Sequence, residues 1–385
     1  MLSRKFWLCL GIFWLVFGGA VQAATCPKSF DPRRDYFPAK VAPQYASAFS
    51  VVYHKNYKLV TVRNPWRGAS KAFQYVLVQC GTPDPLGFKS EQIIHVPVPS
   101  IAALSTTHVA MLEKLGLLDF LIATNQPSLI YSPQVQRRLQ SGKTKSVGQE
   151  NAINVEALID IQPALVTTFA LGPDADDYPR LAKSGLKLVL NADYMETSPL
   201  GRSEWLKFMA LFFNQEAQAN QIFAGIVQRY ESSSKLAQRA KTHPTVFTGF
   251  SIKGTWYIPG GKSYVAQFLK DAGAEYLWAD NLETGSIPLG FEAIYERAAS
   301  AKFWLPGNLN WRALRDLQVE DTRNGQFQAF KIGQVYNNNL RLNAAGSDDY
   351  WESGLVNPDL VLADLIRIFH PEVLPKHSLF YYRKL

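Results

Sequence analysis

Residues 202–241 read RSEWLKFMALFFNQEAQANQIFAGIVQRYESSSKLAQRAK. The stretch contains no proline and a single glycine, Gly225, and its apolar residues recur at the period of an α-helix. An unbroken helix of this length would extend about 60 Å, which is too long for one compact lobe. We therefore expect a break near Asn214, followed by a second helix of about 40 Å that can bridge two lobes.

Short apolar strands alternate with amphipathic helices on both sides of this stretch. Before it, the pattern predicts strands at 93–96, 120–124, 165–168 and 186–190 and helices at 107–117 and 155–161. After it, strands at 245–249, 276–278, 303–305 and 335–336 alternate with helices at 263–272, 291–299 and 357–369. Such alternation is typical of parallel sheets. The expected fold class is α/β, with two lobes of mainly parallel sheet joined by a long linker helix.

The front of the chain has a different pattern. Residues 49–53, 57–62 and 73–78 alternate aromatic or β-branched residues with polar ones, which predicts an antiparallel meander. We therefore divide the chain into five parts: residues 1–23 as a signal peptide, 24–90 as a β-rich N-terminal extension, 91–200 as the first α/β lobe, 201–241 as the helical linker, and 242–385 as the second α/β lobe and tail.

The first residues have the pattern of a secretory signal peptide. Arg4 and Lys5 precede an apolar run, and Val21-Gln22-Ala23 supplies the small residues of a cleavage site. We expect cleavage after Ala23 and a periplasmic location. Two alternatives stay open. The first is an uncleaved membrane anchor, for which the apolar run is short. The second is a lipoprotein acylated at Cys26, which is disfavoured because Thr25 stands where such signals place a smaller residue.

Two cysteines remain once the signal peptide, which contains Cys9, is removed. In an exported protein the simplest expectation is a disulfide between Cys26 and Cys80, the alternative being two unpaired buried thiols. Closing so long a loop would contribute about 4 kcal/mol in the chain-entropy model.

Composition excludes several classes of protein. With 47% hydrophobic, 19% charged and 13% aromatic residues, the chain is not disordered, collagenous or a coiled coil. The formal net charge is +8, or +6 without the two basic residues of the signal peptide. The sequence contains no run of basic residues of the kind that binds nucleic acids. An anionic small ligand or an acidic surface therefore matches the positive net charge better.

Signatures of the common enzyme classes are missing from the sequence. The six histidines include no pair at metal-ligand spacing, and there is no G-x-S-x-G, GxGxxG or complete phosphate-loop motif. Gly261-Lys262-Ser263 resembles the end of a phosphate loop, but Trp256 replaces its opening glycine. Asp348, Asp349 and Glu352 are compatible with a cation site, a ligand rim or a polar loop. We therefore expect no cofactor and no resident metal.

Candidate binding residues follow the strand ends, where α/β folds place their ligand-facing loops. The expected ligand contacts are Ser105, Thr106, Thr107, Thr168, Phe169, Trp256, Tyr257, Asn338, Tyr350 and Trp351. Arg202 and Arg341 are candidate charge partners for an anionic ligand, since a guanidinium offers a fixed fork of donors. Each of these two arginines also has a structural interpretation, in which it anchors its own helix or loop.

Five segments carry a resemblance to a known family: residues 96–108, 154–163, 196–205, 260–264, and 349–352 with 357–364. From about residue 90 onward the chain resembles the helical-backbone, class III substrate-binding proteins of ABC importers, which carry ferric siderophores, haem or cobalamin. The resemblance implies docking on the permease through a glutamate near the start of a helix in each lobe, and Glu156 and Glu292 match those places. Ala164 and Lys302 depart from the pattern, where the family often has aspartate.

Taken together, these features predict an exported monomer that captures a small-molecule metal chelate, a ferric siderophore in the first instance, and delivers it to an ABC permease. The mild positive charge and the many aromatic residues favour a bulky, partly anionic chelate. No enzymatic step and no nucleic-acid partner are expected. Two alternatives stay open: an exported hydrolytic enzyme on an α/β scaffold, and an envelope protein-interaction module that uses the β-rich extension.

Overall fold

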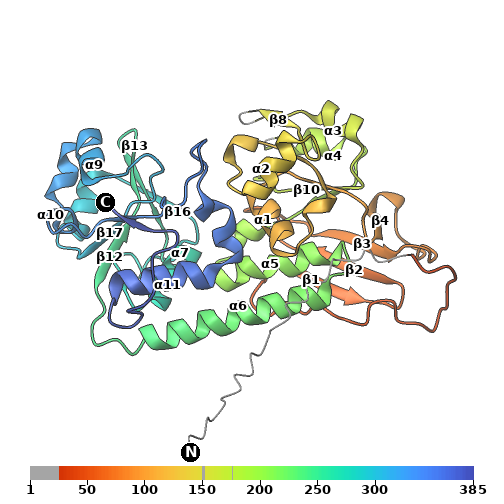
Figure 1. Ribbon diagram of the computed structural model, residues 1–385, viewed down its shortest axis with the longest axis horizontal. Coiled ribbons are helices and arrows are strands. Elements are labelled where there is room, and N and C mark those ends of the chain that lie inside the picture. Colours follow the sequence, from red (N-terminus) through yellow and green to blue (C-terminus); the bar gives the residue numbers. More distant parts are fainter. Residues whose placement is uncertain (1–25, 150–151, 176) are drawn as a thin grey trace, which may run out of the picture.

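Two α/β lobes lie side by side along the long axis of the molecule, and a pair of helices connects them (Figure 1). The computed structural model describes residues 26–149, 152–175 and 177–385. The connecting helices are α5 (Pro199–Leu211) and α6 (Glu216–Ala237). Ala219 of α6 belongs to the core of the first lobe, whereas Ile226 and Tyr230 belong to the core of the second. The predicted linker that crosses from one lobe to the other is therefore confirmed.

The expected break in the linker lies where the sequence placed it. α5 ends at Leu211, and Asn214 adopts a left-handed conformation with φ of 54°, which ends the helical hydrogen bonding before α6 begins. Asparagine tolerates this conformation better than most residues. α6 has 22 residues and extends about 33 Å, which is shorter than expected because it ends at Ala237.

The first lobe is built on a parallel sheet with the strand order β11-β10-β5-β6-β7. Its strands are β5 (Ile101–Ala103), β6 (Leu121–Thr124), β7 (Lys145–Ser146), β10 (Leu165–Thr168) and β11 (Leu188–Leu190). The lobe also contains α1 (Thr106–Lys114), α2 (Pro133–Gln140), α3 (Val155–Ile161), α4 (Tyr178–Ala182) and the short pair β8 (Gly148–Gln149) and β9 (Ala152–Ile153).

The extension forms its own four-stranded sheet, β1 (Phe49–Tyr53), β2 (Tyr57–Val62), β3 (Phe73–Gln79) and β4 (Ile93–Val96). The predicted antiparallel meander is confirmed for β1, β2 and β3. β4, which we expected to open the sheet of the first lobe, instead pairs in parallel with β3. The sheet packs on α5, with the ring centroids of Phe49 and Trp205 4.9 Å apart.

Two buried carboxylates next to the linker hold the chain that leads into β1. Glu204 accepts hydrogen bonds from the backbone N–H groups of Gln44, Tyr45 and Ala46 at 2.7–3.0 Å. Glu196 accepts from the N–H groups of residues 47 and 48 at 2.9–3.0 Å. A buried carboxylate is costly unless it is fully hydrogen-bonded. These contacts therefore fix residues 44–48 against the helix.

Lys58 of β2 fastens the extension to the break between α5 and α6. Its Nζ donates to the carbonyl oxygen of Leu211 at 2.6 Å, to Oδ1 of Asn214 at 2.9 Å and to Oε1 of Glu216 at 2.7 Å. The side chain has no exposed surface, and Glu216 is only 4% exposed. One lysine thus supplies donors to the end of one helix and the start of the next.

The second lobe combines a parallel sheet, ordered β15-β12-β17, with an antiparallel one, ordered β13-β14-β16. Its strands are β12 (Thr245–Thr248), β13 (Phe250–Ile252), β14 (Thr255–Pro259), β15 (Glu275–Tyr276), β16 (Ser286–Leu289), β17 (Phe303–Leu305), β18 (Tyr336–Asn337) and β19 (Arg383–Lys384). Its helices are α7 (Tyr264–Asp271), α8 (Phe291–Ala298), α9 (Leu314–Glu320), α10 (Gln328–Lys331) and α11 (Pro358–Phe369). The core is aromatic, with stacked rings of Phe247 and Trp304 5.2 Å apart.

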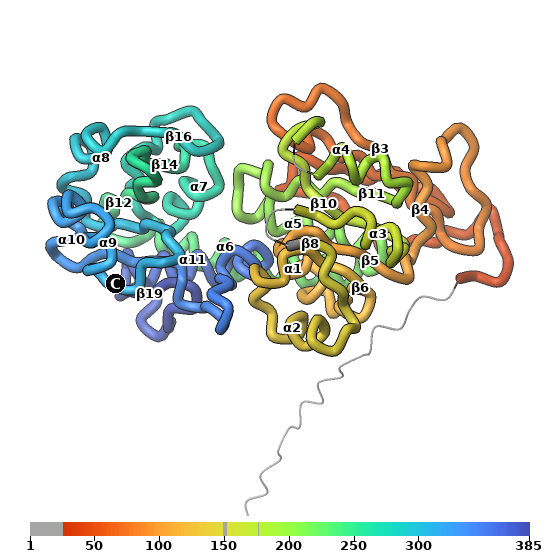
Figure 2. The backbone as a smooth tube through the Cα atoms, turned by 90° about the horizontal axis from the view of Figure 1, so that it is seen from above, coloured from red at the N-terminus to blue at the C-terminus, as the bar shows by residue number. Residues whose placement is uncertain are grey.

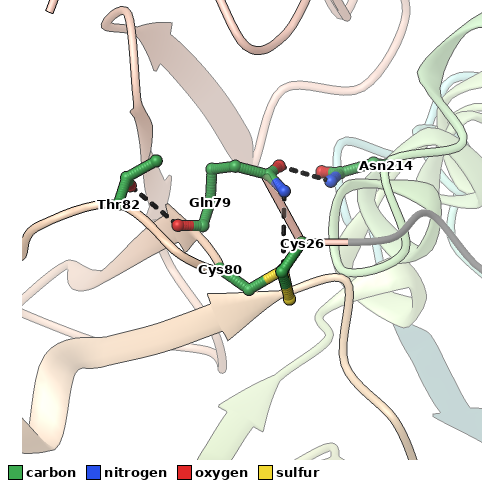
Figure 3. Close-up of a disulfide and its surroundings, with 5 residues drawn as sticks. All are labelled: Cys26, Gln79, Cys80, Thr82 and Asn214. Atoms are coloured by element: carbon green, nitrogen blue, oxygen red, sulfur yellow. Dashed lines mark hydrogen bonds between the residues drawn. A yellow bond between two sulfur atoms is a disulfide. The ribbon is translucent and has the colours of Figure 1, made fainter. Parts of the chain in front are cut away.

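Figure 2, seen from above, places the extension at the end of the molecule farthest from the second lobe, except for one loop that turns back toward it. The far end contains the disulfide between Cys26 and Cys80, drawn in Figure 3, and this pairing confirms the expectation from the sequence. Beside it, Gln79 accepts a hydrogen bond from Asn214 of the helix break at 2.8 Å.

The expected signal peptide, residues 1–23, lies outside the described residues. In the part of the chain that the structure describes, no helix has the length and apolar character needed to cross a membrane.

Candidate ligand-binding cleft

The second lobe contributes an aromatic cavity of about 240 Å³, here called the second-lobe cavity. It forms where β12 ends and β14 passes, because alternate residues of β14, Tyr257 and Pro259, face this side of the strand. None of the side chains that line it is charged. The aromatic and polar members are Thr248, Phe250, Tyr257, Phe268, Ser286, Asn338, Tyr350, Trp351 and Tyr382. Aromatic walls with a few polar groups are typical of small-molecule sites.

A crevice of about 40 Å³, the floor crevice, continues from this cavity toward the first lobe. Tyr350 and Trp351 line both spaces, and Thr107 at the start of α1 lines the crevice from the first lobe. Arg202, in the first turn of α5, lies with its guanidinium 4.3 Å from the ring centre of Tyr264. Its buried Nε has no hydrogen-bond partner among the described residues. The positively charged Arg202 side chain therefore lies between the lobes, and its Nε–H can donate a hydrogen bond to a ligand.

The first lobe contains a more polar cavity of about 420 Å³, the first-lobe cavity. It lies at the carboxyl ends of parallel strands β5, β6 and β10, the edge where such sheets bind ligands. Its polar and aromatic members are Ser105, Thr106, Asn125, Gln126, Thr168, Phe169, Asp177 and Tyr178. Thr106 lines this cavity and its chain neighbour Thr107 lines the floor crevice, so both spaces border the start of α1.

Most of the residues expected at the site line these three spaces. The first-lobe cavity contains Ser105, Thr106, Thr168 and Phe169, the floor crevice contains Thr107 and Arg202, and the second-lobe cavity contains Tyr257 and Asn338. Tyr350 and Trp351 lie where the last two meet.

Two of the expected contacts lie elsewhere. Trp256 is 1% exposed and packs in the aromatic core, because it faces the opposite side of β14 from Tyr257. Arg341 lines none of the three spaces. It pairs with Asp349 at 2.6 Å and lies over the rings of Tyr131 and Phe380. These positions correct the expectation that both side chains face the ligand, and for Arg341 they match its structural interpretation.

Several lining residues were missed by the sequence analysis. Phe250 lies two residues after the end of β12 and was available to the strand-end argument. Tyr178 and Phe268 lie within helices, and Tyr382 lies in the C-terminal tail, so no motif or strand end marks them. Their presence in the cleft follows from tertiary packing alone.

The segment of residues 341–352, here called the interlobe segment, bridges the lobes at the base of the cleft. Glu352 accepts hydrogen bonds from the backbone N–H groups of Tyr131 at 2.5 Å and Ser132 at 3.0 Å. Asn343 donates to the carbonyl oxygen of Ile130 at 2.9 Å. The second lobe therefore holds the loop before α2 of the first lobe by direct contacts, in addition to the linker helices.

Two carboxyl groups of the interlobe segment titrate near neutral pH. Burial raises the pKa of Glu352 from its ordinary 4.5 to about 7, although its two N–H donors oppose the shift. Burial likewise raises the pKa of Asp348 to about 7. Both pKa values lie above those of the same groups in the unfolded protein. Between about pH 4.5 and pH 7 the folded protein therefore binds more protons than the unfolded protein. Its unfolding free energy therefore falls as the pH rises from about 4.5 to about 7.

Replacing Glu352 by glutamine is expected to weaken this pH dependence, because the amide keeps an acceptor for the N–H donors but does not ionise. Urea titrations from about pH 5 to about pH 8 should show a smaller loss of unfolding free energy in Glu352→Gln than in the wild type, by on the order of 1–2 kcal/mol. The exposed Glu296→Gln serves as the control and should follow the wild type. Equal pH dependence in all three proteins would contradict this assignment.

The two glutamates matched to permease docking lie in the first turns of helices, one in each lobe. Glu156 of α3 is 78% exposed and lies 3.5 Å from Arg180, and Glu292 of α8 is 86% exposed and lies 3.6 Å from Arg323. Pairs this exposed are weak. Both carboxylates are therefore free to exchange their present partners for others.

Comparison with known proteins places this architecture in a family. The periplasmic binding protein family matches residues 101–337, more than half of the chain. An uncharacterized lipoprotein of Methanocaldococcus jannaschii is 27% identical over 364 residues, which cover 89% of this chain and 84% of the relative. A second uncharacterized lipoprotein of the same organism is 23% identical over 356 residues, covering 89% and 86%.

Solved structures share the fold at lower identity. A periplasmic binding protein of Veillonella parvula has a TM-score of 0.58 at 12% identity, covering 84% of this chain and 98% of its own. A protein of the ABC-type Fe3+-hydroxamate transport system of Saccharomonospora viridis has a TM-score of 0.54 at 18% identity. The match covers 72% of this chain and 93% of that protein. S. aureus IsdE complexed with heme has a TM-score of 0.53 at 18% identity. The match covers 70% of this chain and 98% of that protein.

The matched residues include the sheet of the first lobe, the whole linker and most of the second lobe. Two α/β lobes joined by a helix that enters both cores are the helical-backbone architecture that the sequence resembled. The chain therefore belongs to the periplasmic binding protein family, and its fold is the helical-backbone one.

Proposed function

We propose that the protein captures a metal chelate, a ferric siderophore in the first instance, in the interlobe cleft and delivers it to an ABC permease without chemical change. The observation that carries the proposal is the arrangement of the three spaces: the second-lobe cavity and the floor crevice share Tyr350 and Trp351, and the floor crevice and the first-lobe cavity both border the start of α1. Structural relatives described as a Fe3+-hydroxamate transport protein and as a complex with heme support the same class of ligand.

The chemistry of the cleft fits a bulky ligand with a mixed surface. The uncharged aromatic wall of the second-lobe cavity suits the organic periphery of a chelate, since aromatic side chains bury large areas at little entropic cost. Arg202 at the floor offers a positive charge to an acidic group that reaches between the lobes. No group arranged for nucleophilic or acid–base catalysis is required in this proposal.

Delivery would use Glu156 and Glu292, each exchanging its own arginine for one on the permease. Charge pairs of this kind govern encounter and orientation more than affinity. The family works outside the cytoplasm, and the signal-peptide pattern at residues 1–23 supports export. Because the Cys26 thiol is consumed in a disulfide, we favour a soluble periplasmic monomer over a form acylated at that residue.

Native mass spectrometry tests the proposal by exposing residues 24–385 to ferric hydroxamates, ferric catecholates, haem and cobalamin. We expect one of these classes to bind with one-to-one stoichiometry and to quench tryptophan fluorescence. Trp351→Ala should weaken that binding by about 30-fold, which corresponds to about 2 kcal/mol. Phe30→Ala removes a comparably exposed aromatic residue of the extension, 39% against 46%, and should have no effect. Failure of the whole panel to bind, or conversion of the chelate into a product, would exclude this function.

A further inference from the structure

The extension sends one loop, residues 63–72, back to the cleft. This loop, here called the strap, joins β2 to β3 and reads RNPWRGASKA, with three basic residues and no acidic one. Figure 2 shows it as the orange loop that lies beside the first lobe on the side of the second. It lies outside the matched family region, which begins at residue 101.

Trp66 anchors the strap to the wall of the first-lobe cavity. Its side chain is 9% exposed, and its ring lies 5.6 Å from the rings of both Phe73 and Tyr178. Tyr178 also lines the first-lobe cavity. The hydroxyl of Tyr194 contacts the carbonyl oxygens of Ala170, at 2.6 Å, and of Pro65, at 3.2 Å. The strap is therefore held against the loop that follows β10.

From this anchored position Arg67 reaches the other lobe. Its Nη2 lies 3.0 Å from Oε2 of Glu283, and both side chains are largely exposed, at 75% and 58%. The Glu283 carbonyl oxygen accepts a hydrogen bond from the N–H of Lys262 at 3.0 Å. It also lies so close to Gly260 that any Cβ there would collide with it. The loop bearing Glu283 is thus fixed against the turn that follows Pro259, a residue of the second-lobe cavity.

We propose that the strap is a third wall of the binding cleft and that the pair Arg67–Glu283 acts as a rim contact that slows ligand exchange. This inference rests on the proposed function for its ligand. The pair connects the rim of one cavity to the rim of the other, so opening the cleft on this side requires breaking it. An exposed ion pair is weak. The contact therefore retards exchange without locking the cleft.

The first test measures the dissociation rate of the bound chelate by stopped-flow fluorescence. Arg67→Glu and Glu283→Arg should each release it about two to five times faster, because each places like charges together. The double exchange Arg67→Glu/Glu283→Arg should restore the wild-type rate. Lys71→Glu makes the same charge change in the strap and should leave the rate unchanged. At about 1 M salt all rates should converge. Equal rates for all variants at low salt would overturn the proposal.

The second test needs no ligand, so its failure is distinguishable from failure of the proposed function. In the ligand-free protein, a short bismaleimide should cross-link Arg67→Cys/Glu283→Cys at least about tenfold faster than Lys71→Cys/Glu283→Cys, because its span matches two side chains that meet at their ends. Mass spectrometry after proteolysis identifies the linked peptides. Equal cross-linking of the two pairs would show that the strap does not bridge the cleft, whatever the protein binds.

Discussion

Replacing Lys58 by methionine should lower the free energy of unfolding by about 3–5 kcal/mol, the cost of breaking a buried ion pair by removing one partner. Methionine fills a similar volume, so the loss comes from polar groups left without a donor. Glu216 would keep a buried charge, and the Leu211 carbonyl and the Asn214 side chain would each lose a hydrogen bond. Burial lowers the pKa of Lys58, and the negative charge of Glu216 opposes that shift. The buried ammonium group of Lys58 is therefore stabilised by its partner carboxylate.

Urea denaturation of the wild type, Lys58→Met and Lys58→Met/Glu216→Leu measures this effect. The double variant should recover much of the loss, because it removes both buried charges. Lys55→Met changes an exposed lysine in the loop between β1 and β2 and should shift the unfolding free energy by no more than about 0.5 kcal/mol. A Lys58→Met protein as stable as Lys55→Met would show that the lysine does not hold the helix break.

The second large effect is expected from the disulfide. Cys26→Ser/Cys80→Ser should be about 4 kcal/mol less stable than the oxidised wild type, since the bond closes a loop across a sequence separation of 54 residues. In the chain-entropy model the loss arises in the unfolded state, which gains freedom when the loop opens. The cleft lies far from this bond along the chain, so the folded variant should still bind the same ligand.

Chemical denaturation with and without reductant checks this prediction. The reduced wild type should match the double serine variant, and reductant should not change the variant itself. If the oxidised wild type and the variant unfold at the same denaturant concentration, the disulfide contributes nothing measurable. If the variant fails to fold, the reduced wild type provides the same comparison.

The sequence predicted local structure well where a local cause decides it. The helix break was predictable because an unbroken helix would be too long, and Asn214 tolerates the left-handed conformation found there. The strands at 49–53 and 165–168 were predictable from β-branched and aromatic residues. β4 was assigned to the wrong sheet because its sequence shows a strand and does not show which neighbour it pairs with.

The site was predictable only in part, for the same reason. The strand-end rule located Tyr257, but it did not determine which face of β14 meets solvent, so Trp256 was misplaced. The interactions that join the extension to the linker were not predictable. Lys58 and Glu216 are 158 residues apart, and nothing in either local pattern marks a buried pair.

The two carboxylates that receive the N–H groups of residues 44–48 also determine what a shortened protein would be. A chain that lacks the residues before 101 would take away the N–H donors of Glu196 and Glu204, and the apolar side of α5 would lose its cover and face water. The leading sheet is thus no detachable accessory. We expect it to unfold together with the connecting helices, so that deleting it destabilises the lobes it covers.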